Sequence, residues 1–92
     1  MIIKTLIIYQ NKILYNILNE VNENFNFKIM YVEDLDFNFE RFPNHIILVQ
    51  KEISELKNQL IIDKMPIRLH KLIEIINVRF LKQEYNFQSN IN

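Results

Sequence analysis

The sequence predicts a small α/β domain, a three-layer sandwich around a mainly parallel four-stranded sheet. The 92 residues fit one domain, and a hydrophobic fraction of 49 % with 24 % charged residues is typical of a globular chain. Short apolar runs alternate with stretches of helical periodicity, as in strands joined by crossover helices. The chain has no glycine, which tight two-residue hairpins usually need, so crossover connections are favoured over hairpins.

The first half of the chain is expected to form a strand, a helix and a second strand. Residues 2–9 are nearly all apolar and rich in β-branched side chains, which predicts a strand buried on both faces. Asn11 can cap the helix that follows, and Asn24 is expected to end it in a left-handed conformation. Residues 27–32 alternate more and predict a strand nearer an edge. The apolar residues of the helix recur at helical spacing: Ile13, Leu14, Ile17, Leu18 and Val21.

The middle of the chain is expected to form a connection, a strand and a short helix. Residues 33–44 are acidic and aromatic, with room for one helical turn. Residues 45–49 predict a buried third strand, and residues 51–58 a short helix with Ile53 and Leu56 directed inward. The aromatic residues of the connection are expected to fold back over the core where a helix is missing: Phe37, Phe39 and Phe42.

The end of the chain is expected to form a fourth strand and a long helix, which gives the order β-α-β-β-α-β-α. Residues 60–62 predict the strand, and Pro66 suits the first turn of a helix ending near Tyr85. Residues 1–85 then form the domain, and residues 86–92 a polar tail or interdomain linker. The predicted inward face of the helix is Leu69, Leu72, Ile73, Ile76 and Phe80.

Composition excludes several classes of function. Without glycine there is no P-loop and no Gly-rich dinucleotide turn, and without cysteine there is no disulfide, thiolate zinc site or cysteine nucleophile. A net charge of zero gives no electrostatic footprint for nucleic acid or an anionic membrane. No apolar run approaches the ~20 residues of a membrane span. We therefore expect a cytoplasmic protein that is not an enzyme and has no cofactor and no small-molecule substrate.

Metal binding is not expected at the histidines and is left open at the acidic connection. His45 and His70 lie on different predicted elements and have no second histidine at helical spacing, so neither is expected to bind a metal. Four carboxylates follow the second strand, at the sheet edge where α/β proteins bind ligands. Acidic loops are ordinarily solvated, and cation binding by residues 33–40 stays an open alternative. The four are Glu33, Asp34, Asp36 and Glu40.

Two segments resemble the receiver domain of response regulators. Residues 60–73, LIIDKMPIRLHKLI, resemble the family's last strand, Lys-Pro step and last helix, and residues 43–49, PNHIILV, resemble its third strand. The resemblance covers most of residues 3–85 and implies a truncated receiver-like, flavodoxin-like fold of bacterial two-component signalling. One βα unit of the family is missing between Val49 and Leu60.

The residues that a working receiver needs for phosphorylation are replaced. An acidic pair should follow the first strand to hold Mg²⁺, and an aspartate should end the third strand to accept phosphate. This sequence has neither the acidic pair nor the aspartate. Met65 separates Lys64, which matches the family's lysine, from Pro66. The resemblance therefore implies a pseudo-receiver with a degenerate pocket: Tyr9, Gln10, Val49, Gln50 and Lys64.

The last helix carries a second apolar stripe, on the side away from its predicted core face. An exposed strip of this kind usually marks a partner surface, and nearby charges of both signs suit a symmetric contact. The alternative is that the stripe has no function, because a chain this rich in isoleucine exposes some apolar side chains on its surface. The predicted interface of a homodimer is Ile67, Lys71, Glu74, Val78, Leu81 and Tyr85.

Two functional hypotheses follow. The first is a non-catalytic, phosphorylation-independent regulatory and dimerisation domain of a transcription regulator. It would contact DNA only through a C-terminal domain that this sequence does not contain. The second is a stand-alone protein–protein interaction module that binds a signalling partner and has no DNA-binding domain.

Overall fold

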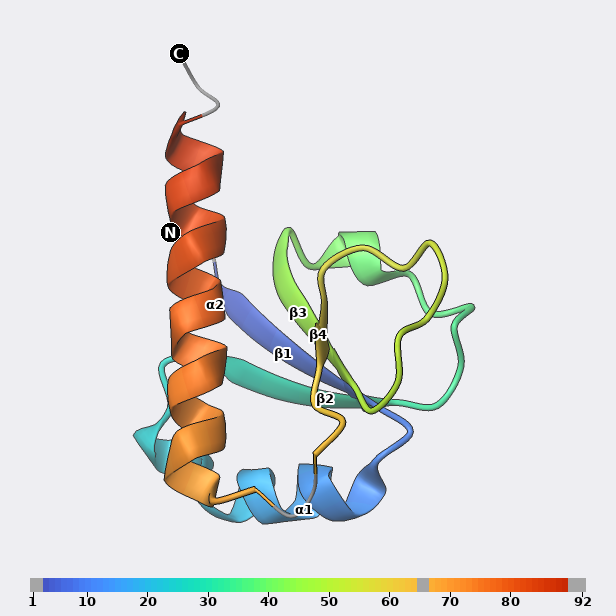
Figure 1. Ribbon diagram of the computed structural model, residues 1–92, viewed down its shortest axis with the longest axis vertical. Coiled ribbons are helices and arrows are strands. Elements are labelled where there is room, and N and C mark those ends of the chain that lie inside the picture. The colour runs from blue at the N-terminus through green and yellow to red at the C-terminus, as the bar shows by residue number, and fades with distance from the viewer. Residues whose placement is uncertain (1–2, 65–66, 90–92) are drawn as a thin grey trace.

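A four-stranded parallel sheet forms the centre of the structure, a computed structural model that describes residues 3–64 and 67–89 (Figure 1). The strands are β1 (Lys4–Tyr9), β2 (Lys28–Val32), β3 (Asn44–Val49) and β4 (Gln59–Ile61). Their order is β2-β1-β3-β4, and each neighbouring pair is parallel. The predicted four-stranded parallel sheet is confirmed, and so is the edge position of the second strand.

The first helix begins where the sequence predicts and ends earlier. α1 spans Lys12–Glu20, and the Asn11 side chain accepts a hydrogen bond from the backbone N–H of Leu14 at 3.1 Å, as expected of an N-cap. At the other end, the backbone N–H of Val21 bonds the carbonyl of Leu18 at 3.2 Å. The helix therefore stops at Val21, and the prediction of Asn24 as its left-handed cap is wrong. A 3₁₀ turn, η1 (Asn22–Asn24), leads on to β2.

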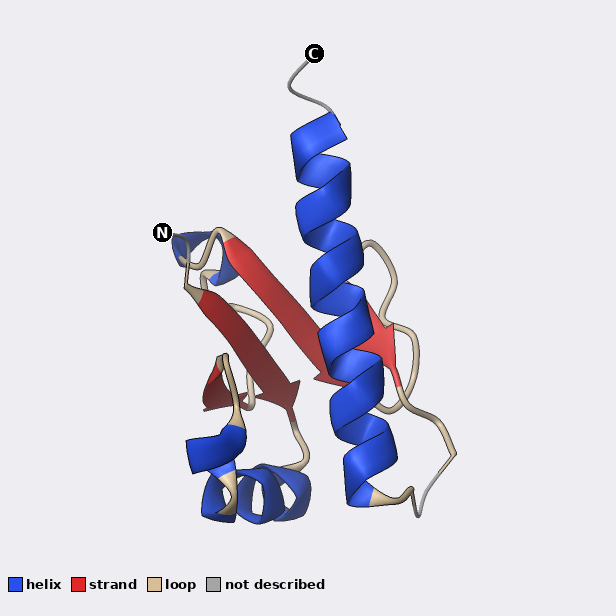
Figure 2. Ribbon diagram, turned by 90° about the vertical axis from the view of Figure 1, so that its left-hand side faces the viewer, coloured by secondary structure: helices blue, strands red, loops and turns tan. Residues whose placement is uncertain are grey.

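Both helices pack on the same face of the sheet (Figure 2, in which α2 passes in front of the strands). Side chains alternate between the two faces of a strand. Leu6 and Ile8 of β1 therefore point to the helices with Ile46 and Leu48 of β3. The helices complete this first core cluster with fully or nearly fully buried side chains: Leu14, Leu18, Leu72, Ile76 and Phe80.

Loops cover the opposite face, on the right of Figure 1. The second core cluster consists of Ile7, Val32, Ile47 and Val49. Phe37, Phe39 and Phe42 fold back over it, as predicted, with the rings of Phe37 and Phe42 stacked at 5.9 Å. The expected sandwich is thus a helical layer, a sheet and a layer of loops that includes the 3₁₀ turn η2 (Phe39–Arg41).

The predicted helix over residues 51–58 is wrong, because this connection between β3 and β4 is a series of turns. The side chain of Gln59 holds it: Oε1 accepts from the Ile53 N–H at 2.9 Å, and Nε2 donates to the carbonyls of Ile53 at 2.8 Å and Leu56 at 2.9 Å. Glu55 and Asn58 adopt positive φ angles of 66° and 63°, which a right-handed helix does not contain. Ile53 and Leu56 still pack inward, on the second core cluster.

The last helix, α2 (Leu69–Ser89), ends later than predicted. Pro66, the predicted start, lies outside the described residues. At the other end the helix continues past Tyr85 to Ser89, so residues 86–89 are helical and not an irregular tail. Residues 90–92 lie outside the described part of the chain.

Three of the five predicted inward residues of α2 are buried, namely Leu72, Ile76 and Phe80. Leu69 is half-buried and packs against the first core cluster. Ile75 also packs there, although the prediction named Ile73. Near its C-terminal end the helix is joined to the starts of two strands. Gln83 Nε2 lies 3.2 Å from both Asn44 Oδ1 and the His45 carbonyl, and Lys4 pairs with Glu84 at 3.4 Å.

Replacing Gln59 by leucine is expected to lower the free energy of unfolding by about 2–3 kcal/mol. The substitution removes three hydrogen bonds, each worth about 1 kcal/mol. Urea denaturation followed by circular dichroism measures the change. The matched control is Gln50→Leu at an exposed position, which should change stability little. Equal effects of the two substitutions would contradict the assigned role of Gln59.

Candidate functional site

The exposed face of α2 carries apolar side chains that nothing in the described structure covers. Val78 is 44 % exposed, Leu81 61 % and Tyr85 72 %, all on the side away from the buried face of the helix. The sequence places these three residues off the core, and the structure agrees. Ile67, the fourth apolar residue of the predicted stripe, is instead half-buried and packs against the first core cluster.

Charged residues of both signs surround this apolar face. Lys71, Glu74 and Lys82 are exposed. Among the described residues the one ion pair joins Lys4 to Glu84, so none of these three has an ionic partner there. Arg79, on the same helix, turns to the sheet and donates from Nη2 to the Gln59 carbonyl at 3.1 Å.

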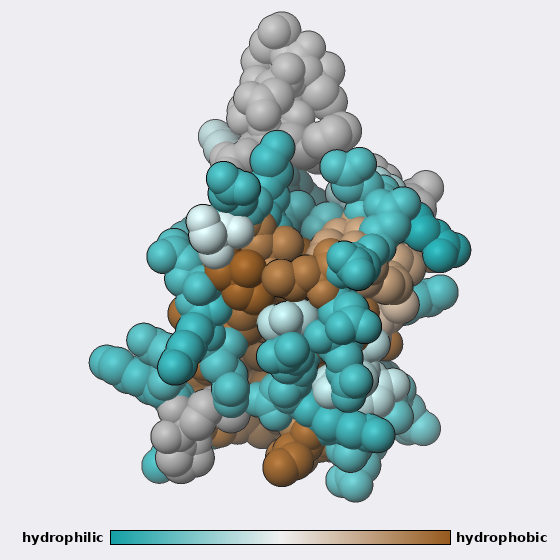
Figure 3. All heavy atoms as spheres, turned by 90° about the vertical axis from the view of Figure 1, so that its right-hand side faces the viewer, coloured by the Kyte–Doolittle hydropathy of each residue, from teal (hydrophilic) through white to brown (hydrophobic). Residues whose placement is uncertain are grey.

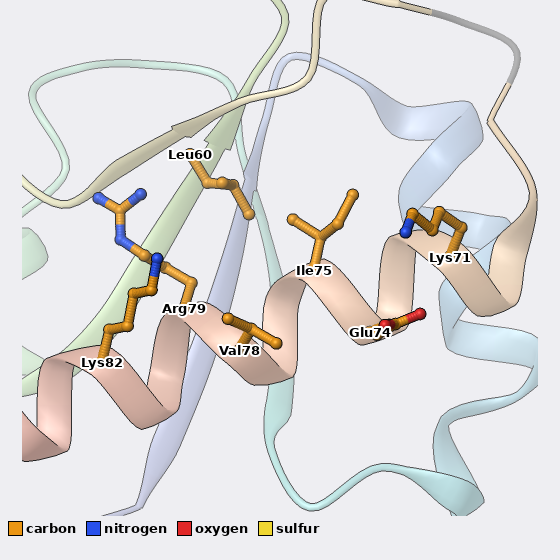
Figure 4. Close-up of a pocket in the computed structure, with 7 residues that line it drawn as sticks. All are labelled: Leu60, Lys71, Glu74, Ile75, Val78, Arg79 and Lys82. Carbon is orange, nitrogen blue, oxygen red and sulfur yellow. The ribbon is translucent and has the colours of Figure 1, made fainter.

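A groove of about 300 Å³ lies between α2 and the edge strand β4 (Figure 4). Leu60 of β4 and Ile75 of α2 point toward each other across it, and Val78 lies beside them on the helix. The charged lining residues are Lys71, Glu74, Arg79 and Lys82. The groove is therefore apolar at its centre, charged at its rim and continuous with the exposed stripe through Val78.

The positions that the resemblance to a receiver singles out lie largely at the carboxyl ends of the strands. Tyr9 and Val49 follow the paired residues Ile8 and Leu48 of β1 and β3. Val49 is buried in the second core cluster and Tyr9 packs against that cluster, so the structure brings these two together as hydrophobic packing. Gln50 and Lys64 are exposed.

Gln10 joins the ends of β1 and β2. Its backbone N–H bonds the Val32 carbonyl at 3.0 Å and its side-chain Nε2 donates to the Glu33 carbonyl at 3.2 Å. It does so at a φ of 57°, in the left-handed region that glycine would otherwise occupy. The side chain and the backbone of Gln10 therefore both hold the ends of these two strands together.

His45 is a core histidine whose two ring nitrogens both have polar neighbours. It is 7 % exposed, with Nδ1 at 2.6 Å from the Phe42 carbonyl and Nε2 at 3.4 Å from Asn58 Nδ2. A neutral ring protonated at Nδ1 satisfies both contacts. His70 is exposed on α2. No three metal-binding side chains come together anywhere in residues 3–64 and 67–89, the acidic connection included.

A second hollow, of about 440 Å³, lies on the loop-covered face. Figure 3 shows this face, where hydrophobic atoms are visible between hydrophilic side chains. Phe37, Phe39 and Leu56 line the hollow, and the buried polar residue in its wall is His45. Because both ring nitrogens of His45 already have polar neighbours, the hollow is weaker as a binding site than the groove beside α2.

Comparison with protein-family models, with curated proteins and with solved structures finds no match to this chain. The candidate site therefore rests on the geometry of the chain itself. As for membranes, none of the helices in the described part combines the length and apolarity that crossing a bilayer requires.

The phenol of Tyr31 lies beside the acidic connection. Partial burial, together with a 3.1 Å hydrogen bond to Glu33 Oε1 and the charge of that carboxylate, raises the pKa of Tyr31 above 10.0. The folded state then keeps the phenol proton at pH values where the unfolded chain has lost it. This contribution to stability is complete below pH 10 and is lost as the pH rises through the folded pKa.

Glu33→Gln is expected to lower the pKa of Tyr31 toward 10.0, because the substitution removes the negative charge beside the phenol. Tyrosinate absorbance during an alkaline titration measures this pKa, with Tyr31→Phe identifying the contribution of that ring. Asp34→Asn is the control and should leave the titration midpoint where it is. A midpoint insensitive to Glu33→Gln would show that the carboxylate does not act on Tyr31.

Proposed function

We propose that this chain is a non-catalytic, phosphorylation-independent regulatory domain that forms a homodimer through α2, as part of a transcription regulator. The observation that carries the proposal is the exposed stripe of Val78, Leu81 and Tyr85 on α2. Each of the three sits on a regular helix whose opposite side already supplies the core. The fold therefore gains nothing from their apolar character.

The stripe has the features of a contact surface. An apolar patch rimmed by polar groups typically marks a protein–protein interface, and burying it contributes roughly 25 cal/mol per Å². A second copy of the chain is the partner that the charges favour. In a two-fold contact the same patch faces itself, so it must carry both signs of charge, as Lys71, Glu74 and Lys82 do.

The regulatory part of the proposal rests on the resemblance of residues 60–73 to a receiver and on the sheet. The strand order β2-β1-β3-β4 is compatible with the first four strands of the flavodoxin-like order 2-1-3-4-5. At the ends of β1 and β3, Gln10 and Val49 offer no carboxylate for a phosphoryl group or for Mg²⁺. Dimerisation through α2, independent of phosphorylation, is then the means by which such a domain acts.

Replacing Val78 and Leu81 by aspartate is expected to abolish the homodimer and leave the fold intact, because both side chains lie outside the core. Sedimentation equilibrium in the micromolar range measures the association, and circular dichroism measures the fold. Ile13→Asp is the matched control, since Ile13 is 76 % exposed on α1, and it should leave the dimer unchanged. A wild-type chain that stays strictly monomeric at high micromolar concentration would sink the proposal.

Incubation with acetyl phosphate and Mg²⁺ is expected to give no acid-labile phosphoryl adduct, since the residues that would hold the metal and accept the group are replaced. Intact-mass spectrometry before and after acid treatment measures the adduct. The same treatment should leave the dimer dissociation constant unchanged. An adduct, or a shift in that constant, would overturn the phosphorylation-independent role.

A further inference from the structure

We infer that two copies of this chain pair their α2 helices antiparallel, with the two-fold axis passing beside Val78. The inference rests on the proposed homodimer and adds its geometry. It follows from the charges around Val78, which have opposite signs where the surface meets a copy of itself.

In an antiparallel helix pair, residues equally far before and after the axis face each other. With the axis at Val78, Glu74 faces Lys82 of the second copy, and the symmetry forms this ion pair twice. Lys71 faces Tyr85 of the second copy, where an ammonium group over an exposed phenol ring gives a cation–π contact. These charged groups have no ionic partner within the described part of the monomer, so the pairing supplies the partners that the fold leaves out.

The same register brings charge to the end of the groove beside α2. Ile75 lines the groove opposite Leu60, on the same flank of α2 as Lys82. A two-fold axis keeps each flank on its own side of the contact, so Lys82 of the second copy stands next to Ile75. Leu81, which is 61 % exposed in the monomer, lies on the other flank and is covered there by the second copy. Val78 meets Val78 of the second copy on the axis, so the middle of the contact is apolar and its rim is charged.

The free edge of β4 is less suited to receive a partner strand. The Asn58 carbonyl and the Ile62 N–H bond to β3, so by alternation the Gln59 carbonyl faces outward. Arg79 already donates to that carbonyl at 3.1 Å, and an added strand would have to displace it. A helix laid across α2 leaves this contact in place.

A parallel pairing of the helices is disfavoured by charge. In a parallel two-fold pair each residue faces its own copy, which brings together like charges at Lys71, Glu74 and Lys82. The antiparallel register about Val78 replaces two of these repulsions by attractive contacts between opposite charges. Sliding the pair to place Val78 against Leu81 would put Glu74 beside Tyr85 and lose both ion pairs.

Cysteine cross-linking tests the register directly, because the chain contains no other cysteine. Val78→Cys is expected to give a disulfide-linked dimer under mild oxidation, since two β-carbons on the axis come within bonding distance. A mixture of Glu74→Cys and Lys82→Cys should cross-link more readily than either variant alone. Ile13→Cys on the exposed side of α1 is the control and should remain uncross-linked. Cross-linking of Val78→Cys with Leu81→Cys in preference to itself would overturn the register.

Charge reversal gives a second and independent readout. Lys82→Glu and Glu74→Lys are each expected to weaken the homodimer about tenfold, because both symmetric ion pairs become repulsive. In an equimolar mixture the two variants should form a heterodimer of near wild-type affinity, since every pair across it is again opposite in charge. Lys12→Glu on α1 is the control and should leave the dissociation constant unchanged.

The outcomes distinguish a failure of the proposed register from a failure of the proposed homodimer. A wild-type dimer in which Val78→Cys fails to cross-link and the charge-reversed variants fail to complement each other overturns the antiparallel register, while the homodimer of the proposed function stands. A wild-type chain that is monomeric in the same experiments overturns both. Cross-linking at Val78 together with complementation supports both.

Discussion

Everything in this fold depends on burying both faces of a parallel sheet with helices on only one of them. Parallel strands need long connections, and these usually supply helices to both sides. Here α1 and α2 both lie on the first core cluster, so the second cluster of Ile7, Val32, Ile47 and Val49 must be covered by irregular chain. Three phenylalanines in one loop and the connection held by Gln59 provide that cover.

The periodicity of the sequence predicts those structural features that depend only on residues close together along the chain. The four strands, the Asn11 cap and the aromatic fold-back all follow from local apolar pattern and capping chemistry. The connection at residues 51–58 could not be predicted in this way. Its backbone is satisfied by the side chain of Gln59, which the next strand carries, and that tertiary contact overrides a helical pattern. The C-terminal end of α2 was also mispredicted, because no local signal marks its continuation to Ser89.

In the candidate site, too, the features set by local spacing could be predicted, and those set by tertiary contacts could not. Helical spacing alone separates Val78, Leu81 and Tyr85 from the buried face of α2. The groove could not be found from spacing, because its other wall is Leu60, whose distance from Ile75 depends on where β4 lies in the sheet. The same holds for Arg79 and Glu84, whose contacts with Gln59 and Lys4 remove two charges that the sequence leaves available to a partner.

The continuation of α2 to Ser89 sets a length scale for the proposed pair. The helix projects beyond the sheet at its C-terminal end (Figure 1). In an antiparallel pair centred at Val78, the two projecting ends point in opposite directions. At about 1.5 Å per residue they stand roughly 33 Å apart along the helix axes. In the proposed pair the C-terminal ends of the two helices therefore lie on opposite sides of the contact and not side by side.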